Sequence, residues 1–213
     1  MKYYLEARSI PCKQQSIEDK HQAFFSGILD LPSPWGSKSI PKLPPIGGNL
    51  SVGVGAKEFA GPGLKGSVHY SFRGLDADSA YADDFINLAF NPRKIDYQQL
   101  VEQIFIKYVQ AMNAYFAEIS DDEFIFQDYD ERKRLKIDAR HGLYRIPAVL
   151  YARDDFCRRA LGLGAAEVQA RLNDRVATSE LIQGGVLIVL SRDVLTAPEM
   201  DALSTKAKSA LAS

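Results

Sequence analysis

A predicted hairpin near the C-terminus constrains the fold of this chain most strongly. The segment ELIQGGVLIVLS, residues 180–191, places Gln183-Gly184-Gly185 between two apolar runs, which is a signal for a tight β-turn. The five consecutive apolar residues at 186–190 predict a central strand that is covered on both faces. This part of the chain therefore predicts a sheet with helices packed on it.

Alternating or short apolar patterns predict further strands earlier in the chain. Residues 2–8 alternate apolar and polar positions, and so do the stretches around 50–54 and 67–73. The last two are expected to form an antiparallel pair. Residues 85–90 read as a short apolar strand or helix turn, and residues 145–151 as a strand.

Capping patterns mark the predicted helices. Ser16 precedes an apolar stripe and is followed three residues later by Asp19, a variant capping box. Asp96 with Gln99 opens a helix expected over 97–117. A short helix at 154–161 ends at Gly162, another follows at 165–172, and Thr196 with Glu199 starts the last one. The prediction is one α+β domain over 1–213, a mostly antiparallel sheet with helices packed on it.

The segment 31–48 interrupts this pattern. It contains five prolines and three glycines. Proline fixes φ and removes a backbone donor, so this segment is predicted to be a long surface loop rather than regular structure. The loop contains Trp35, the only tryptophan.

Charge and cysteine usage limit the partners and the compartment. Lys and Arg number 26 against 27 Asp and Glu, a net charge of -1, which disfavours nucleic acid as a direct ligand. The N-terminus lacks the apolar core of a secretory signal, and no run is long enough for a membrane span. Cys12 and Cys157 are expected to be free thiols in a reducing compartment. The prediction is a cytoplasmic protein without a membrane partner.

Common catalytic motifs are missing from the sequence. His21, His69 and His141 lie on separate predicted elements without metal-ligand spacing. Gly53 and Gly55 are better explained as turn glycines than as a phosphate-binding loop. Cys157 is expected to be buried and inert. No catalytic residue, metal or cofactor is predicted; the alternative is a small soluble enzyme with a site around His69, Arg73 and Cys157.

One acidic segment has residue types that suggest a functional site. Residues 118–131 hold seven acids in 14 positions with no base, and bases follow at 132–136. A metal nuclease could use Asp121 or Asp122 with Glu131 and Lys133, although that motif requires a strand around Glu131. Two further readings stay open: an acidic face that docks a basic partner, or a solvated helix end with local ion pairs.

The order of elements in the last third resembles a known family. An apolar strand with Leu150-Tyr151 precedes DDFCRRALGLG, then EVQARLNDRV, then the hairpin and a closing helix. This order is similar to the C-terminal core of immunity proteins that protect bacteria from polymorphic and type VI secretion toxins, in particular the immunity protein 52 family. The most characteristic piece is Leu-x-x-Gly-Gly-x-Leu-Ile at 181–188. The KYYLEAR strand and following helix also resemble that family's start.

The resemblance implies a non-catalytic protein that binds a cognate toxin, often a nuclease in this family, and blocks it. The family's tryptophan before the Leu150-Tyr151 strand is absent here. A carboxylate-rich segment could occupy a cationic nuclease site, and an exposed tryptophan could anchor the contact. A homodimer is left open. The predicted partner-binding residues are Asp121, Asp122, Glu123, Asp128, Asp130 and Trp35.

Overall fold

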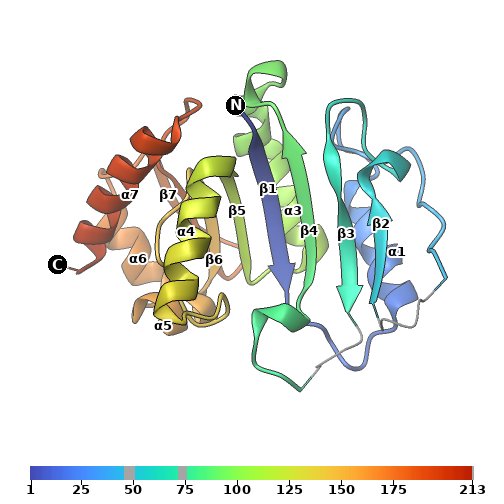
Figure 1. The fold of residues 1–213 in the computed structure, drawn as a ribbon, viewed down its shortest axis with the longest axis horizontal. Helices are drawn as coiled ribbons and strands as arrows, with labels where there is room; N and C mark the ends of the chain where they lie inside the picture. The colour runs from blue at the N-terminus through green and yellow to red at the C-terminus, as the bar shows by residue number, and fades with distance from the viewer. Residues whose placement is uncertain (46–50, 72–75, 213) are drawn as a thin grey trace.

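The computed structural model describes residues 1–45, 51–71 and 76–212. These residues form an eight-stranded sheet in the order β2-β3-β4-β1-β5-β6-β8-β7, and every neighbouring pair is antiparallel (Figure 1). The α+β class with a mostly antiparallel sheet is therefore confirmed. The strands are β1 (Tyr3–Ser9), β2 (Ser51–Gly55), β3 (Lys65–Ser71), β4 (Asp84–Phe90), β5 (Phe116–Asp121), β6 (Val149–Arg153), β7 (Thr178–Ile182) and β8 (Gly185–Val189).

Alternation along β1 defines the two faces of the sheet. Tyr3, Leu5 and Ala7 are fully buried and point to what we call the first face. Their neighbours Glu6 and Arg8 point to the second face and are only partly buried. The period-2 pattern of a strand produces this separation. The second face of β1 is therefore polar, and it lies in the middle of the sheet.

Helices from the first part of the chain cover the first face. They pack on β1, β3 and β4 around one large core that includes Phe24, Phe25 and Tyr108. In Figure 1 they lie behind the sheet. The segments are α1 (Ile17–Ile28), α2 (Tyr97–Gln99), the π-helical turn η4 (Leu100–Ile104) and α3 (Phe105–Met112).

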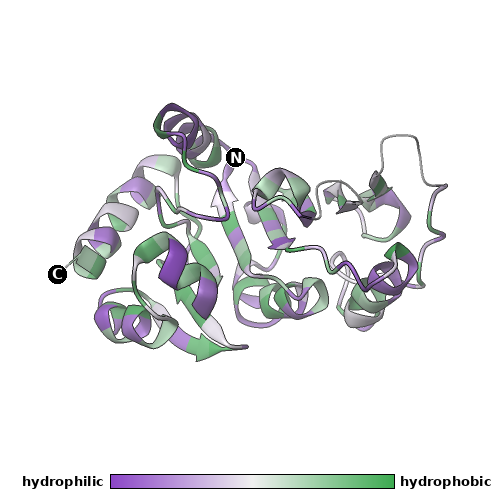
Figure 2. Cartoon of the chain, turned by 90° about the horizontal axis from the view of Figure 1, so that it is seen from below, coloured by the Kyte–Doolittle hydropathy of each residue, from purple (hydrophilic) through white to green (hydrophobic). Residues whose placement is uncertain are grey.

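Helices from the last part of the chain cover the second face over β5, β6, β8 and β7. Leu150 and Ile188 on this face pack against Phe156 and Val168 in a second core. Viewed from below, helices accordingly lie on both sides of the sheet (Figure 2). The segments are α4 (Asp122–Leu135), α5 (Asp154–Leu161), α6 (Ala165–Leu172) and α7 (Ala197–Ala212).

The second face over β1, β4 and β3 has no such cover. It faces the viewer in Figure 1, and none of the described α-helices crosses it. Side chains there, such as Asn87 and His69, are partly exposed. None of the helices in the described ranges combines the length and apolar character that a bilayer crossing requires.

The capping box at Ser16 and the hairpin turn are confirmed. The Ser16 side chain accepts a hydrogen bond from the Asp19 amide at 3.0 Å, and the Asp19 carboxylate accepts one from the Ser16 amide at 3.3 Å. Gln183 and Gly184 at the β7–β8 turn have φ of 50° and 71°. Such positive values suit the tight hairpin turns that match strand twist.

The predicted helix at 97–117 is too long. It ends at Met112, because Asn113 adopts a left-handed conformation with φ of 47°. Phe116 then starts β5, so the apolar residues after Met112 belong to a strand. The apolar stripe alone did not reveal the change of period, since buried strands and helices both use aromatic side chains.

Candidate binding site

The predicted acidic segment forms the end of β5 and the helix α4, and two of its acids have structural roles. Asp121 is the N-cap of α4 and accepts a hydrogen bond from the Glu123 amide at 3.0 Å. Asp128 points inward and accepts one from Arg132 Nε at 2.7 Å. Both carboxylates are largely buried. The prediction that these two contact a partner therefore loses its basis, since neither presents its carboxylate on the outer surface.

The remaining predicted acids do lie on the outer surface of α4. Asp122, Glu123 and Asp130 are exposed, and Asp122 forms an ion pair with Lys2 at 3.5 Å. Two large aromatic side chains accompany them: Phe126 is 65% exposed and Tyr129 54%. Exposed large aromatics on a rigid helix are typical of protein-binding surfaces. The sequence analysis named the acids and missed both aromatics.

Trp35 is not an exposed anchor, and the prediction that it is one is wrong. Its side chain is 2% exposed and packs edge-on against Phe90 and Tyr108. The Tyr108 hydroxyl also donates a hydrogen bond to the Trp35 carbonyl at 2.6 Å. Residues 31–45 lack helices and strands as predicted and keep many exposed positions, but Trp35 is buried and Leu31, Ile40 and Leu43 pack against the core. Residues 46–48 lie outside the described residues.

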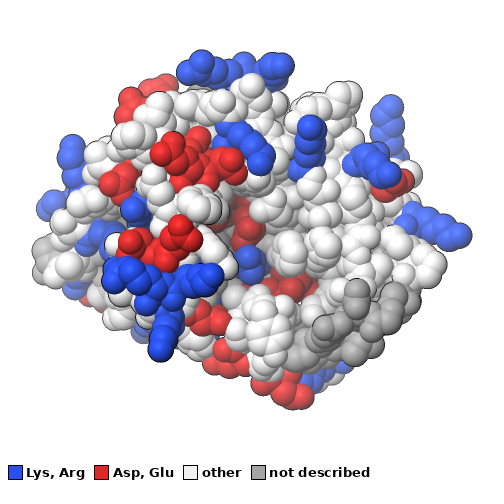
Figure 3. Space-filling model, in the orientation of Figure 1, with Lys and Arg blue, Asp and Glu red and all other residues white. Residues whose placement is uncertain are grey.

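A groove of about 450 Å³ runs between α4 and the uncovered half of the sheet. It continues into a small cavity beneath α4, since the two share Glu6, Glu118 and Arg132 among their walls. Figure 3 shows this face of the molecule, with acidic and basic atoms in the hollow near its centre. Side chains from β1, β5 and α4 that line the groove include Tyr4, Glu6, Glu118, Asp122, Phe126 and Tyr129.

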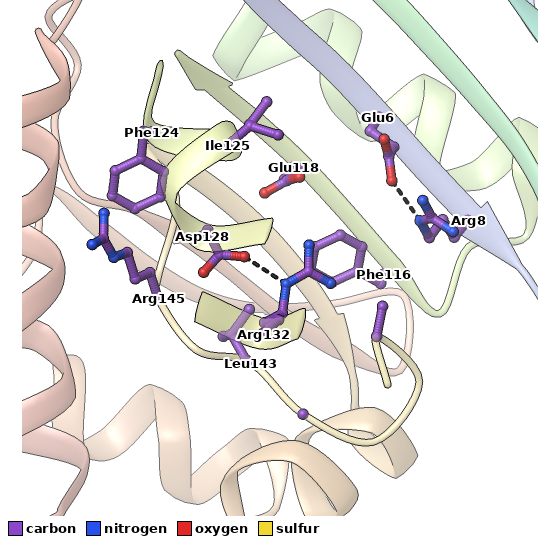
Figure 4. Close-up of a pocket in the computed structure, with 12 residues that line it drawn as sticks. Glu6, Arg8, Phe116, Glu118, Phe124, Ile125, Asp128, Arg132, Leu143 and Arg145 are labelled. Atoms are coloured by element: carbon purple, nitrogen blue, oxygen red, sulfur yellow. Dashed lines mark hydrogen bonds and ion pairs between the residues drawn. The ribbon is translucent and has the colours of Figure 1, made fainter. Parts of the chain in front are cut away.

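Glu6 and Glu118 lie directly opposite each other on β1 and β5. Like charges at opposed positions repel, so each needs a compensating partner. Glu6 has two: Arg8 Nε donates to it at 2.5 Å, and Asn87 Nδ2 at 3.1 Å. Glu118 lies between the Glu6–Arg8 pair and the Asp128–Arg132 pair (Figure 4).

The Glu118 carboxyl group receives neither a hydrogen bond nor an ion pair from any residue that the structure describes. Burial, reinforced by the negative charges of Glu6 and Asp128, raises the pKa of Glu118 to about 8. Arg132 and Arg8 act in the opposite direction but are engaged with other carboxylates. A carboxyl group that stays protonated at neutral pH in a groove is a candidate functional group.

A buried ion pair lies near Arg8, one of the residues that line the groove. Arg140 Nη2 lies 2.6 Å from Asp83, and the Tyr115 hydroxyl donates to the same carboxylate at 2.7 Å. Arg8 Nη1 lies 3.9 Å from Asp83 and donates a hydrogen bond to the Ala80 carbonyl at 3.3 Å. Burial raises the pKa of Asp83, while the hydrogen bonds from Tyr115 and Arg140 oppose this shift. The cluster fixes Arg8, and through Arg8 the orientation of Glu6.

The residues of the alternative enzyme site do not come together. His69 stacks on Phe85 at 4.8 Å and hydrogen-bonds to Ser67 at 2.7 Å, and burial lowers its pKa. Cys157 is buried in the second core, and burial raises its pKa to about 12. Strands β4, β1 and β5 separate these two regions. Arg73 lies outside the described residues.

Two other sequence interpretations need correction. Gly53 and Gly55 lie in strand β2, not in a turn. A Cβ at Gly53 would come within 2.7 Å of the His69 ring, so a larger residue there would have to displace that ring. The nuclease arrangement is not formed, because Glu131 lies on helix α4 and pairs with Arg134 at 2.7 Å. No cluster of three metal-ligating side chains is found within the described ranges.

Comparison of the chain with protein-family models, with curated proteins and with solved structures gave no match.

The groove itself was missed by sequence reasoning. Its one signal in the sequence is the pair of charged residues, Glu6 and Arg8, at alternate positions of an otherwise apolar strand. Such charges on a central strand indicate a sheet face without a helix over it.

Proposed function

We propose that this chain is a non-catalytic immunity protein of the cytoplasm that binds a cognate secreted antibacterial toxin and blocks its active or substrate site. The observation that supports this most is the surface of α4, where Phe126 and Tyr129 are exposed among carboxylates beside a groove. An isolated chain gains nothing from exposing such aromatics on a rigid helix. A partner that covers them would gain both apolar burial and specificity.

The charge of this surface supports a basic partner. Glu123 and Asp130 are exposed on α4 and have no ion pair among the described residues, while Asp122 pairs only with the exposed Lys2. Nuclease active sites are cationic or metal-loaded because they hold phosphates. Carboxylates on the rim of an interface steer such a partner and increase the association rate. We therefore propose a nuclease effector, delivered by type VI secretion, as the toxin.

Co-expression with the product of the neighbouring gene tests the proposal. The wild-type chain should rescue cells from that product and co-purify with it in a fixed ratio. Replacing Phe126 and Tyr129 together with alanine should weaken binding by about 2–4 kcal/mol, the range of interface hot spots, and abolish rescue. The matched control is Leu181→Ala, which removes an exposed apolar side chain on the edge strand β7.

Charge reversal separates the aromatic contribution from the acidic one. Changing Asp122, Glu123 and Asp130 to lysine should reduce the association rate more than it increases the dissociation rate, and the loss should shrink at high salt. Unchanged neutralisation by this triple variant would show that the acids do not contact the toxin. If both the aromatic double variant and the charge-reversal triple variant still rescue cells, α4 is not part of the binding surface.

An enzyme remains the second candidate, and one observation favours it. Glu6 and Glu118 face each other across adjacent strands, and Glu118 holds its proton at neutral pH. Two carboxyl groups with different protonation states are the basis of acid–base hydrolysis. In that case Glu118→Gln would abolish protection while leaving any physical association with the toxin intact. Rescue without stoichiometric binding would favour the enzyme.

A further inference from the structure

We propose that the groove between α4 and β1 receives an arginine side chain of the partner protein, with its guanidinium group against Glu118 and its stem against Tyr4 and Tyr129. The proposal deepens the proposed function, since it rests on a protein partner. It specifies which chemical group of that partner enters this chain. The groove, the unpaired carboxylate and the aromatic walls support it independently of the toxin's identity.

Charged side chains from β1, from α4 and from the loop after α4 face Glu118, and none of them is a free base. From β1 these are Glu6 and Arg8, and from α4 they are Asp122, Asp128 and Arg132; Arg145 faces the cavity from the loop after α4. Each of the other acids has a base of its own: Glu6 has Arg8, Asp128 has Arg132, and Asp122 has Lys2. Arg145 is paired with Asp201 at 3.4 Å.

Glu118 is therefore the one carboxylate of the groove without a base, and the described residues hold no spare base within reach. A partly buried carboxylate without a counterion is costly when ionised, and it binds a proton instead. For this reason burial, together with the charges of Glu6 and Asp128, raises the pKa of Glu118 to about 8. A cation brought by a ligand would replace that proton, so binding should release a proton and strengthen as the pH rises.

The walls of the groove favour arginine as that cation. Tyr4, Phe126 and Tyr129 line the groove together with Glu118. A guanidinium group is planar and weakly hydrated, and it stacks on aromatic rings while it donates two hydrogen bonds to a carboxylate. An ammonium group is more strongly hydrated and gains less from the rings. A phosphate-bearing ligand is disfavoured, since it would meet the unpaired carboxylate.

Titration with small probes tests the site without the toxin. The probes are N-acetyl-arginine amide and its neutral analogue N-acetyl-citrulline amide, and the readout is the NMR shifts of residues around Glu118. We expect saturable shifts with the arginine probe, confined to β1, β5 and α4, and binding about tenfold or more tighter at pH 9 than at pH 6. Citrulline should produce no saturable shift.

Two variants and one control decide the outcome. Glu118→Gln keeps the shape of the side chain and should lose at least tenfold in affinity, together with the pH dependence. Tyr129→Ala should weaken binding several-fold at every pH, which provides a second variant that removes only an exposed ring. Glu180→Gln, at an exposed position of the edge strand β7, should bind like the wild type.

Several results would overturn the proposal: no arginine binding, equal binding of citrulline, or unchanged binding by Glu118→Gln. These results leave the proposed function standing if the wild-type chain still neutralises and co-purifies with the toxin. Conversely, arginine binding without any toxin association would contradict the proposed function and would still support an arginine site in the groove. With a toxin in hand, replacing its interface arginines one at a time by lysine should identify the residue that enters the groove.

Discussion

The two halves of the sheet differ in how many of their faces are covered. Strands β1 to β4 have helices on the first face only, whereas β5, β6 and β8 have helices α4 to α7 on the second face as well as core contacts on the first. β8 is accordingly buried at every position, while β1 alternates. The half with one covered face can therefore keep polar side chains such as Glu6 and Asn87 accessible to a ligand. The groove lies at the boundary between the halves.

The largest effect should come from breaking the ion pair that joins the halves. Asp83 precedes β4, Arg140 follows α4, and Tyr115 connects α3 to β5. We expect Arg140→Ala to lower the free energy of unfolding by about 3–5 kcal/mol, since Asp83 is left buried without its counterion. Urea denaturation measures this, and Arg158→Ala in an exposed pair is the control and should be nearly neutral. A small loss at Arg140 would mean that the halves do not depend on this contact.

Core truncation should distinguish the covered from the uncovered half of the second face. Ile188→Ala, beneath the helices of the covered half, should cost about 2–5 kcal/mol. Tyr4→Ala, on the same face of the uncovered half, should cost less than about 1 kcal/mol, because its ring is partly exposed already. Thermal and urea unfolding of both variants provide the comparison. Similar losses at both sites would show that the uncovered half is packed against something in solution, such as a second copy of the chain.

Glu118 should make the protein less stable as the pH rises. Its pKa is about 8 in the folded chain against an ordinary value of 4.5. The folded state therefore holds a proton that the unfolded state has lost between these values, so stability falls as the pH rises through this window. Glu118→Gln removes this dependence. We expect the variant to match the wild type near pH 4 and to become progressively more stable than the wild type as the pH rises from 4.5 to 8.

A series of urea denaturations from pH 4 to pH 9 on both proteins measures the effect. Glu123→Gln, on the exposed surface of α4, should follow the wild-type curve throughout. An equal slope for wild type and Glu118→Gln would show that Glu118 titrates normally. In that case the groove would hold an ionised carboxylate at neutral pH, and the expected release of a proton on arginine binding would disappear.

The sequence predicted locally specified elements better than contacts between distant segments, for physical reasons. The β7–β8 hairpin and α5 with its stop at Gly162 depend on local turn and capping chemistry, which a short segment specifies by itself. The groove depends on Glu6 and Glu118, which are 112 positions apart and meet only through strand register. Trp35 shows the same limit, since its burial depends on Phe90 and Tyr108, which are distant in sequence.

The smallest effect on stability should come from the surface of α4 that we propose for binding. Phe126 and Tyr129 are mostly exposed, whereas Phe124 on the same helix is 2% exposed and packs in the core. Alanine at 126 or 129 should change the free energy of unfolding by less than about 0.5 kcal/mol, while Phe124→Ala should cost about 3–5 kcal/mol. Urea denaturation of the three single variants makes the comparison within one helix. A stability loss at 126 or 129 close to that at 124 would mean that these aromatics hold α4 on the sheet, and their exposure would no longer support a partner.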